Sequence, residues 1–223
     1  MLKQRRMNWL GHVMQMGDGR IPKDLLKCTL VLQTGGFFVE AGAVDGELNS
    51  NTLFLERTRN WTGLLIEPFP EMYKDLVNKH RKAYSINAAL AVSNVSAQVP
   101  FISHGHKGST GHISGMSNDA TYSVKALPLY SILLALNVTV VDFLSLDING
   151  DELKVLQTTP WNKVKVRLIC VGLTFNPDGE DTLKEFMNKQ GYKHLVTRNN
   201  DVWFGWPDLL NQTMKKNETF LLS

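Results

Sequence analysis

Residues 37–47, FFVEAGAVDGE, form the stretch that decides the predicted fold. Its first five residues are apolar apart from one acid, which is typical of a strand buried on both faces. Gly42 and Gly46 follow, and glycine adopts backbone conformations that tight turns need and other residues avoid. In an open α/β sheet, ligands bind outside the carboxyl ends of the strands, at such a strand-to-helix turn. The stretch therefore predicts a central strand and a ligand-binding bend.

The rest of the chain alternates apolar, β-rich runs with amphipathic runs, which is typical of βαβ units and a parallel sheet. Helices are predicted to begin near Leu48, Pro70, Leu127 and Gly150, and a further helix to end at Gly191. The fold class is therefore α/β, a mostly parallel twisted sheet with helices on both faces. Strands are predicted at 37–41, 63–67, 83–87, 140–147 and 164–171, with a final hairpin at 192–197 and 202–205.

Composition limits the class of protein. With 223 residues and 43% hydrophobic content, the chain can bury one substantial core. The net charge of +3 is made up of +4 in residues 1–27 and −1 in the remainder, so the remainder is not expected to bind nucleic acid. Cys28 and Cys170 show no metal-ligand or disulfide spacing, and no metal site is predicted. The longest uncharged run, 126–141, is too short to span a membrane.

We divide the chain into a basic segment at 1–30, a main domain at 31–205 and a polar C-terminal tail at 206–223. In the first of these, RRMNWLGHVMQMGDGRIPKDLLK resembles the C-terminal tail of reverse transcriptases from LINE-type retrotransposons, over residues 1–28. The resemblance implies either a basic nucleic-acid contact or an inserted piece with no role in the main activity.

The charges around the bend indicate which nucleotide it suits. Glu67 ends the second predicted strand at about the offset, roughly 20 residues, at which an acid accepts hydrogen bonds from a ribose. Asp45 and Glu47 flank Gly46, where they would repel a diphosphate but suit the ammonium and sulfonium groups of S-adenosylmethionine. The alternative is that both are ordinary acids of a first helical turn, favoured by the helix dipole.

Five separated motifs resemble the FkbM-type methyltransferase domain, and most closely its arthropod Star-like branch: FFVEAGAVDGELNSNTLFLE, WTGLLIEPFPEMY, INAAL, LPLYSILLALNVTVVDFLSLDINGDELKVLQTTPW and NNDVWF. The resemblance implies a class I methyltransferase, Rossmann-like fold, with a seven-stranded sheet that has one antiparallel strand. It places Glu40, Gly42 and Gly46 at the methionine part of the cofactor, Glu67 at the ribose, and Asn87 and Ala88 at the adenine. The expected cofactor site also includes Ala43, Asp45, Asn51 and Pro68.

Asp147 is the candidate catalytic residue, because the motif LSLDING places it at a strand end that faces the site. An oxygen nucleophile needs a general base, and an aspartate can serve. The alternative is that Asp147 caps the next helix. Asp151 and Glu152 are predicted to be solvated acids of that helix.

Two positions depart from the pattern of the family. Asn149 stands where an acid is expected in the motif D-V-E-G, and Gly172 where an acid commonly follows the fifth strand. If either acid contacts the nucleophile or a metal, catalysis is impaired here. His104, His106 and His112 lie in the stretch SHGHKGSTGHISG, which we predict to be a loop over the substrate. The alternative is a metal site.

The leading functional hypothesis is S-adenosylmethionine-dependent O-methyl transfer to a small-molecule or glycan-like acceptor. The second is a catalytically impaired Star-like protein that acts in membrane trafficking between endoplasmic reticulum, Golgi and endosomes. The chain as it stands suggests the cytoplasm, and an upstream membrane anchor would instead place it at the endoplasmic reticulum or Golgi. Glycosylation sequons at Asn60, Asn94, Asn137, Asn211 and Asn217 are a hint of the latter. The sequence predicts no oligomeric state.

Overall fold

The computed structural model describes residues 33–104, 110–113, 122–174 and 177–207. The basic segment at 1–30, nearly all of the polar tail and the sequons at Asn211 and Asn217 lie outside these residues. Within them, no helix has both the length and the apolar character that crossing a bilayer requires.

The strands are β1 (Phe37–Ala41), β2 (Thr62–Ile66), β3 (Tyr84–Ile86), β4 (Ala89–Leu90), β5 (Ala97–His104), β6 (Thr110–Ile113), β7 (Tyr122–Leu127), β8 (Val140–Leu146), β9 (Lys165–Gly172), β10 (Lys193–Arg198) and β11 (Asp201–Gly205). The helices are α4 (Leu53–Arg59), α5 (Pro70–Asn78), α6 (Leu129–Ala135), α7 (Glu152–Thr158) and α8 (Gly179–Lys189).

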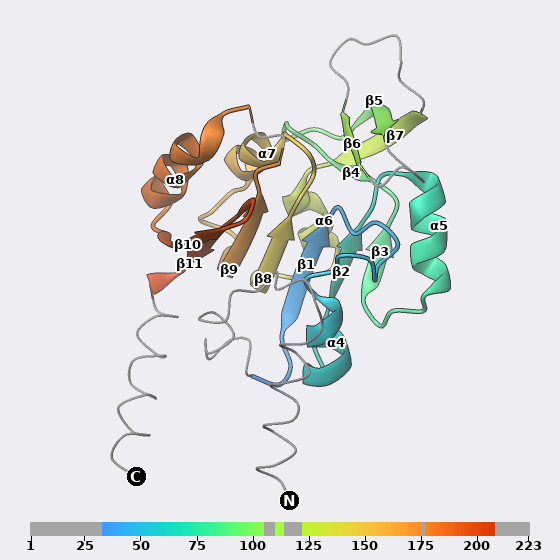
Figure 1. The fold of residues 1–223 in the computed structure, drawn as a ribbon, viewed down its shortest axis with the longest axis horizontal. Helices are drawn as coiled ribbons and strands as arrows, with labels where there is room; N and C mark the ends of the chain where they lie inside the picture. The colour runs from blue at the N-terminus through green and yellow to red at the C-terminus, as the bar shows by residue number, and fades with distance from the viewer. Residues whose placement is uncertain (1–32, 105–109, 114–121, 175–176, 208–223) are drawn as a thin grey trace, which may run out of the picture.

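The main sheet has seven strands in the order β10-β11-β9-β8-β1-β2-β3 (Figure 1). Neighbouring strands pair in parallel except at β11, which runs antiparallel to both β9 and β10. The central pair is β1 with β8, with Phe38 opposite Phe143 and Ala41 opposite Leu146. The predicted α/β fold class and the expected single antiparallel strand are confirmed.

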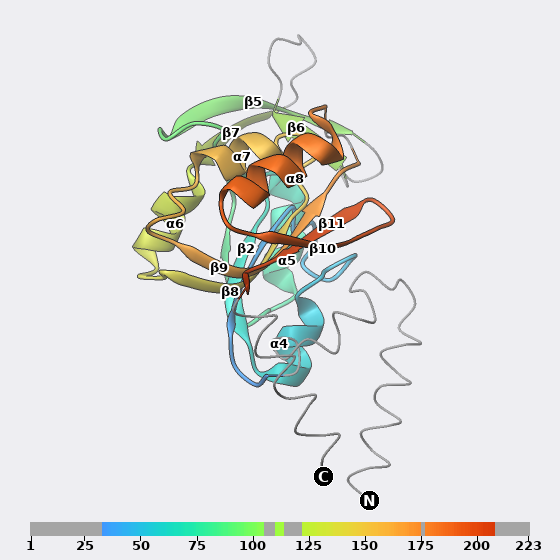
Figure 2. The same ribbon diagram turned by 90° about the vertical axis from the view of Figure 1, so that its left-hand side faces the viewer.

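Helices cover the sheet on both faces, as Figures 1 and 2 together show. On one face, α6, α7 and α8 pack on Val39, Leu144 and Ile169 of the central strands. On the other face, Leu55 of α4 and Leu76 of α5 join a second buried cluster. Because side chains alternate along a strand, Glu40 of β1 faces this second side, toward α4.

A smaller sheet, in the order β4-β7-β5-β6, lies at the top of Figure 1. It packs against α5 and the residues before it, and Phe69 meets Tyr122 edge-on with ring centroids 4.9 Å apart. For the described part of SHGHKGSTGHISG, the prediction of a loop was wrong, because β5 ends at His104 and β6 contains His112. Glycine and serine match the composition of loops, and pairing between strands overrides that preference. His106 lies outside the described residues.

Three helices begin later than predicted. The first predicted start was near Leu48, yet α4 begins at Leu53, because Asn49 has a left-handed φ of 60° and interrupts any helix before it. Gly150 has a φ of 121°, so α7 begins two residues after it, at Glu152. Pro128 likewise precedes α6, whereas α5 begins at Pro70 as predicted.

Candidate functional site

The bend after β1, residues 42–46, lies beside the loop after β8. Strand β1 has β2 on one side and β8 on the other, which makes this the switch point where open α/β sheets bind ligands. The amide of Gly42 donates to the carbonyl of Ile66 in β2 (3.0 Å), and the amide of Asp147 donates to the carbonyl of Ala41 in β1 (3.1 Å). The two halves of the predicted site therefore meet across one strand end.

Gly42 is required by both conformation and space. Its φ is 82°, and a Cβ at this position would lie 2.0 Å from the carbonyl oxygen of Asp147. No side chain fits there without moving the backbone of Asp147. Gly46 has a φ of 80°, which closes the bend with an amide bond to the carbonyl of Ala43 (2.8 Å). Gly42 thus brings the backbone of the bend close to the end of β8, and Gly46 turns the bend against Leu76 of α5.

Glu67 directly follows β2, and its carboxylate turns into the bend. Oε2 accepts the amide of Val44 and Oε1 accepts the amide of Phe69, each at 2.8 Å. The residue is buried, and burial raises the pKa of its carboxyl to about 7, although the two amide bonds favour the ionised form. Val44 has a φ of 51°, which is rare for a β-branched residue, and the bond to Glu67 holds it there.

The acids that flank Gly46 are already engaged. Asp45 Oδ1 accepts the amides of Glu47 (2.9 Å) and Leu48 (2.6 Å), and Lys79 approaches the other oxygen at 3.4 Å. Glu47 pairs with Arg57 and with Lys79. The prediction that Asp45 and Glu47 repel a diphosphate assumed two unpaired acids, and here both acids are paired with cations. Asp45 organises the turn, and the charges of both acids are balanced from the side of α4 and α5.

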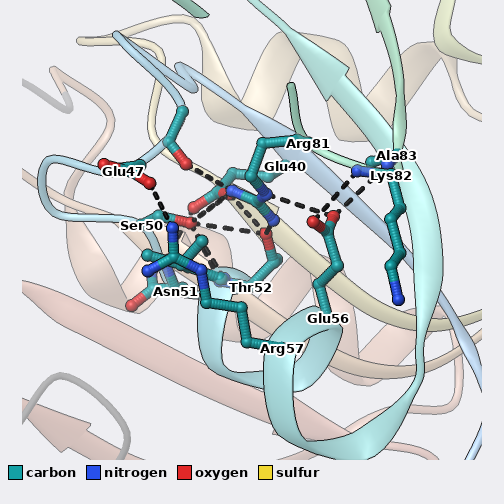
Figure 3. A network of polar contacts seen from close by, with 12 residues as sticks. Glu40, Glu47, Ser50, Asn51, Thr52, Glu56, Arg57, Arg81, Lys82 and Ala83 are labelled. Carbon is teal, nitrogen blue, oxygen red and sulfur yellow. Dashed lines mark hydrogen bonds and ion pairs between the residues drawn. The ribbon is translucent and has the colours of Figure 1, made fainter. Parts of the chain in front are cut away.

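Glu40 lies on β1, but its carboxylate contacts protein rather than the bend (Figure 3). Oε1 accepts the amide of Asn51 (2.7 Å), and Oε2 accepts the hydroxyls of Ser50 (2.8 Å) and Thr52 (2.5 Å). Burial raises the pKa of Glu40, and these bonds oppose the rise. Glu40 thus has a structural role, holding residues 50–52 before α4, and its contact with the methionine part of a cofactor stays a prediction.

Arg81 connects the same loop to the bend and to α4. It donates to Glu56 (3.1 Å), to Thr52 Oγ1 (3.1 Å) and to the carbonyl of Gly46, and only 3% of its side chain is exposed. Glu56 in turn accepts the amide of Lys82 (3.0 Å). Figure 3 shows these groups converging on one buried guanidinium. Sequence reasoning missed Arg81 and Glu56, because nothing in the local pattern distinguishes them from surface residues.

Asn51 is buried, and its two amide atoms differ in their contacts. Nδ2 donates to Ser145 Oγ on β8 (2.9 Å), which ties the loop after the bend to the neighbouring strand. Oδ1 is buried and has no hydrogen-bond partner among the described residues. Such an orphaned acceptor suits a donor supplied by a ligand.

At the other end of the bend, Asn87 joins the ends of β2 and β3. Its Nδ2 donates to the carbonyls of Glu67 (2.8 Å) and Pro68 (3.0 Å). Ala88, the next residue, is buried. Ala43, which follows β1, is also buried, and the resemblance places Asn87 and Ala88 at the adenine side of the cofactor.

The loop after β8 is fixed by an acid that was wrongly predicted to be solvated. Glu152 is buried, and its carboxylate accepts the amides of Ile148 (2.9 Å) and Gly150 (3.0 Å). Burial is the main reason that the pKa of Glu152 is raised, and the charge of Asp147 adds to the rise. The residue before α7 is Asp151, so the alternative that Asp147 caps this helix is also wrong. Asn149, with a φ of 62°, occupies a left-handed position that asparagine tolerates.

Metal-ligating groups do not gather in the part of the chain that the structure describes: no cluster of three or more His, Cys, Asp or Glu side chains occurs there. The site thus consists of the bend, the carboxylate of Glu67 and Asp147, at the carboxyl ends of β1, β2 and β8.

The comparisons with known proteins agree with the fold. The family model of the Methyltransferase FkbM domain matches residues 40–194. Among solved structures, methyltransferase FkbM from Methylobacillus flagellatus KT is similar over 77% of this chain and 44% of its own, with a TM-score of 0.52 and 14% identity. This chain therefore spans less than half the length of that protein.

Two further structures resemble the chain more loosely. Sp1610 of Streptococcus pneumoniae, solved with S-adenosyl-L-methionine, covers 89% of this chain and 88% of its own, at 11% identity and a TM-score of 0.45. TrmK of M. capricolum, solved with S-adenosyl-homocysteine, covers 81% and 65%, at 8% identity and a TM-score of 0.40. Among curated proteins, none matches this chain.

Proposed function

This chain belongs to the Methyltransferase FkbM domain family, and on that premise we propose that it transfers a methyl group from S-adenosylmethionine to an oxygen of a small-molecule or glycan-like acceptor. The observation that carries the proposal is the carboxylate of Glu67, which turns into the bend at the switch point of the sheet. The match of the family model over most of the main domain supports the same activity.

The residues present fit this cofactor. Glu67 uses each oxygen for one backbone amide, and a carboxylate offers about four acceptor positions, so capacity is left for ribose hydroxyls. The buried Oδ1 of Asn51 is a further acceptor. Gly42 leaves the backbone of the bend without a Cβ at its closest approach to β8. We assign the ribose to Glu67 and the methionine side to the bend from Gly42 to Gly46.

When bound, S-adenosylmethionine supplies an electrophilic methyl group on a positively charged sulfur. The protein has to orient the acceptor, exclude water and accept the proton of its hydroxyl. Asp147 is the residue we assign to the proton, because it follows β8 directly and lies against Gly42 of the bend. Asn149 and Gly172 cannot substitute for it, since neither side chain accepts a proton at neutral pH.

Calorimetry with S-adenosylmethionine tests the cofactor. We expect binding by the full chain and a large loss of affinity in Glu67→Ala, with Glu67→Gln intermediate because it retains one acceptor. A wild-type sample with a cooperative unfolding transition but no measurable heat of binding would disprove the proposal.

The class of methyl acceptor can be identified by measuring the release of S-adenosylhomocysteine in the presence of hydroxyl-bearing small molecules and methyl glycosides. Turnover that disappears in Asp147→Asn while cofactor affinity persists supports Asp147 as the base.

A second candidate is a Star-like module of membrane trafficking that binds the cofactor without transferring its methyl group. The observation that favours it is the exposure of Asn60, Asn94 and Asn137, the described sequons, each free to carry a glycan in a luminal protein. Glycan occupancy at Asn94 or Asn137, together with cofactor binding and no turnover on any acceptor, would support this role over the enzyme.

A further inference from the structure

Gly172, the last residue of β9, lies against the side chain of Asp147. A Cβ built on Gly172 would lie 2.6 Å from Oδ1 and 2.9 Å from Cγ of Asp147. Carbon atoms do not approach so closely without displacement of one group. The carboxylate of Asp147 therefore occupies the space that any side chain at position 172 would need.

The backbone of Gly172 does not itself require glycine. The residue belongs to a regular strand, pairs with Asp201 of β11, and is absent from the positions with left-handed φ. An alanine would suit this conformation, and in a strand it is favoured over glycine. Space for the Asp147 carboxylate is what glycine provides here.

Asp147 cannot relieve such a contact easily, because its backbone is held on several sides. Its amide donates to Ala41 (3.1 Å), and its carbonyl oxygen faces Gly42 at a distance that excludes a Cβ. The next residues of the loop are bonded to the buried carboxylate of Glu152. A side chain at position 172 would therefore displace the carboxylate of Asp147 rather than the loop.

We propose that Gly172 is a positioning residue for Asp147: by lacking a side chain at the end of β9, it lets one carboxylate lie across the ends of both β8 and β9. This rests on the proposed function and deepens it, because it places the proton acceptor on the side of the switch point away from β2. The acceptor hydroxyl then approaches over β8 and β9, while the cofactor is held over β1 and β2.

The same contact accounts for the departure from the family pattern at this position. An acid at residue 172 would add a second carboxylate within contact of Asp147, next to the buried Glu152. Like charges at such distances raise the pKa of at least one group, so the acids could not all stay ionised. Gly172 beside the carboxylate of Asp147 is thus an alternative to an acid on β9, and glycine here is compatible with the proposed activity.

A double-mutant cycle tests the steric pairing on the full chain by thermal unfolding. We expect Gly172→Ala to lower Tm by about 3–8 °C, as overpacking in a protein of this size does. In the Asp147→Ala background, the same change should lower Tm by less than about 2 °C, because Oδ1 and Cγ are gone. In Asp147→Asn the full loss should persist, since the amide has the shape of the carboxylate.

Gly205→Ala is the matched control. It is also a strand glycine, and its Cβ would meet only the flexible end of Leu195 at 3.0 Å. Its effect on Tm should be the same whether residue 147 is Asp or Ala. An equal loss from Gly172→Ala in all three backgrounds would overturn the proposal.

Carbon NMR of the side-chain carboxyls separates positioning from mere packing. We expect the pKa of Asp147 to change in Gly172→Ala and to stay unchanged in Gly205→Ala. An unchanged Asp147 pKa in Gly172→Ala would refute the positioning role. Both measurements are made without cofactor, so failure to bind S-adenosylmethionine would remove the proposed function and leave this pairing standing.

Discussion

The two halves of the site are built on different principles. On the cofactor half, residues 40–56 and Arg81 form a network in which every carboxylate is bonded to amides, hydroxyls or a guanidinium. On the acceptor half, two glycines leave room for the backbone and the carboxylate of Asp147, and hydrogen bonds hold the backbone of its loop. The cofactor half depends on buried side-chain bonds, and the acceptor half depends in addition on the space that glycine leaves, so substitutions should affect the two halves through different energies.

The largest effect is expected from Arg81→Met on the cofactor half. It leaves Glu56 buried without its cation, and breaking such a pair costs about 3–5 kcal/mol. Urea unfolding measures the loss. Arg57→Met is the control, because Arg57 is 60% exposed and pairs with Glu47 at the surface, where removal should be nearly neutral. Equal losses of unfolding free energy in Arg81→Met and Arg57→Met would contradict the difference between the buried and the exposed ion pair.

Gly42→Ala comes next, and its difference from Gly35→Ala probes shape. The Cβ would overlap the carbonyl of Asp147, so we expect a loss of about 1–3 kcal/mol from overpacking, in addition to the left-handed φ. Gly35→Ala is the control, since it has a similar φ of 74° but nothing within 4 Å of its Cβ. The difference in unfolding free energy between the two variants isolates the contact. We also expect cofactor binding to fail only in Gly42→Ala.

Much of this organisation could be predicted from the sequence, and the part that could not has a common cause. The apolar run before Gly42 and the position of Glu67 correctly predicted β1, the bend and an acid beside it, because these features are local in the chain, whereas the contact of Glu67 with a ribose stays a prediction. The start of α4, the role of Glu40 and the burial of Glu152 depend on partners that tertiary folding brings in. Arg81 illustrates this, since its acceptors lie on the bend, the following loop and α4.

The pH dependence of binding sharpens the role of the cofactor half. Burial raises the folded-state pKa of Glu67 to about 7 from 4.5, so the protein binds this proton more tightly when folded. Its contribution to stability is therefore complete below about pH 4.5 and is lost as pH rises through 7. Ribose recognition needs the ionised form, so affinity for S-adenosylmethionine should increase, at most about tenfold per pH unit, between pH 5.5 and 7.

Calorimetry across this range checks that slope, and Glu67→Gln should flatten it. A slope that is retained in Glu67→Gln would show that another group titrates.

The smallest effect is expected from Lys79→Met, which releases Asp45 and Glu47 from a shared cation. Because the groups lie near the surface, we expect Tm to change by no more than about 2 °C. The released negative charge should tighten binding of the cationic cofactor by less than about fivefold, and the gain should disappear at high salt. Salt titration of the affinity measures this, and a salt-independent change would point to altered packing instead.

The strand order also sets when each half can be completed during synthesis. Strand β2 pairs with β1 on one side and with β3 on the other, and all three strands have been translated by Ile86. The partner on the other side of β1 is β8, and the antiparallel β11 that borders Gly172 ends only at Gly205. The ribosome thus exposes an unpaired edge of the central strand through the synthesis of more than half the domain, and such edges favour aggregation. From this connectivity we expect the nascent chain to need a chaperone until β8 has been made.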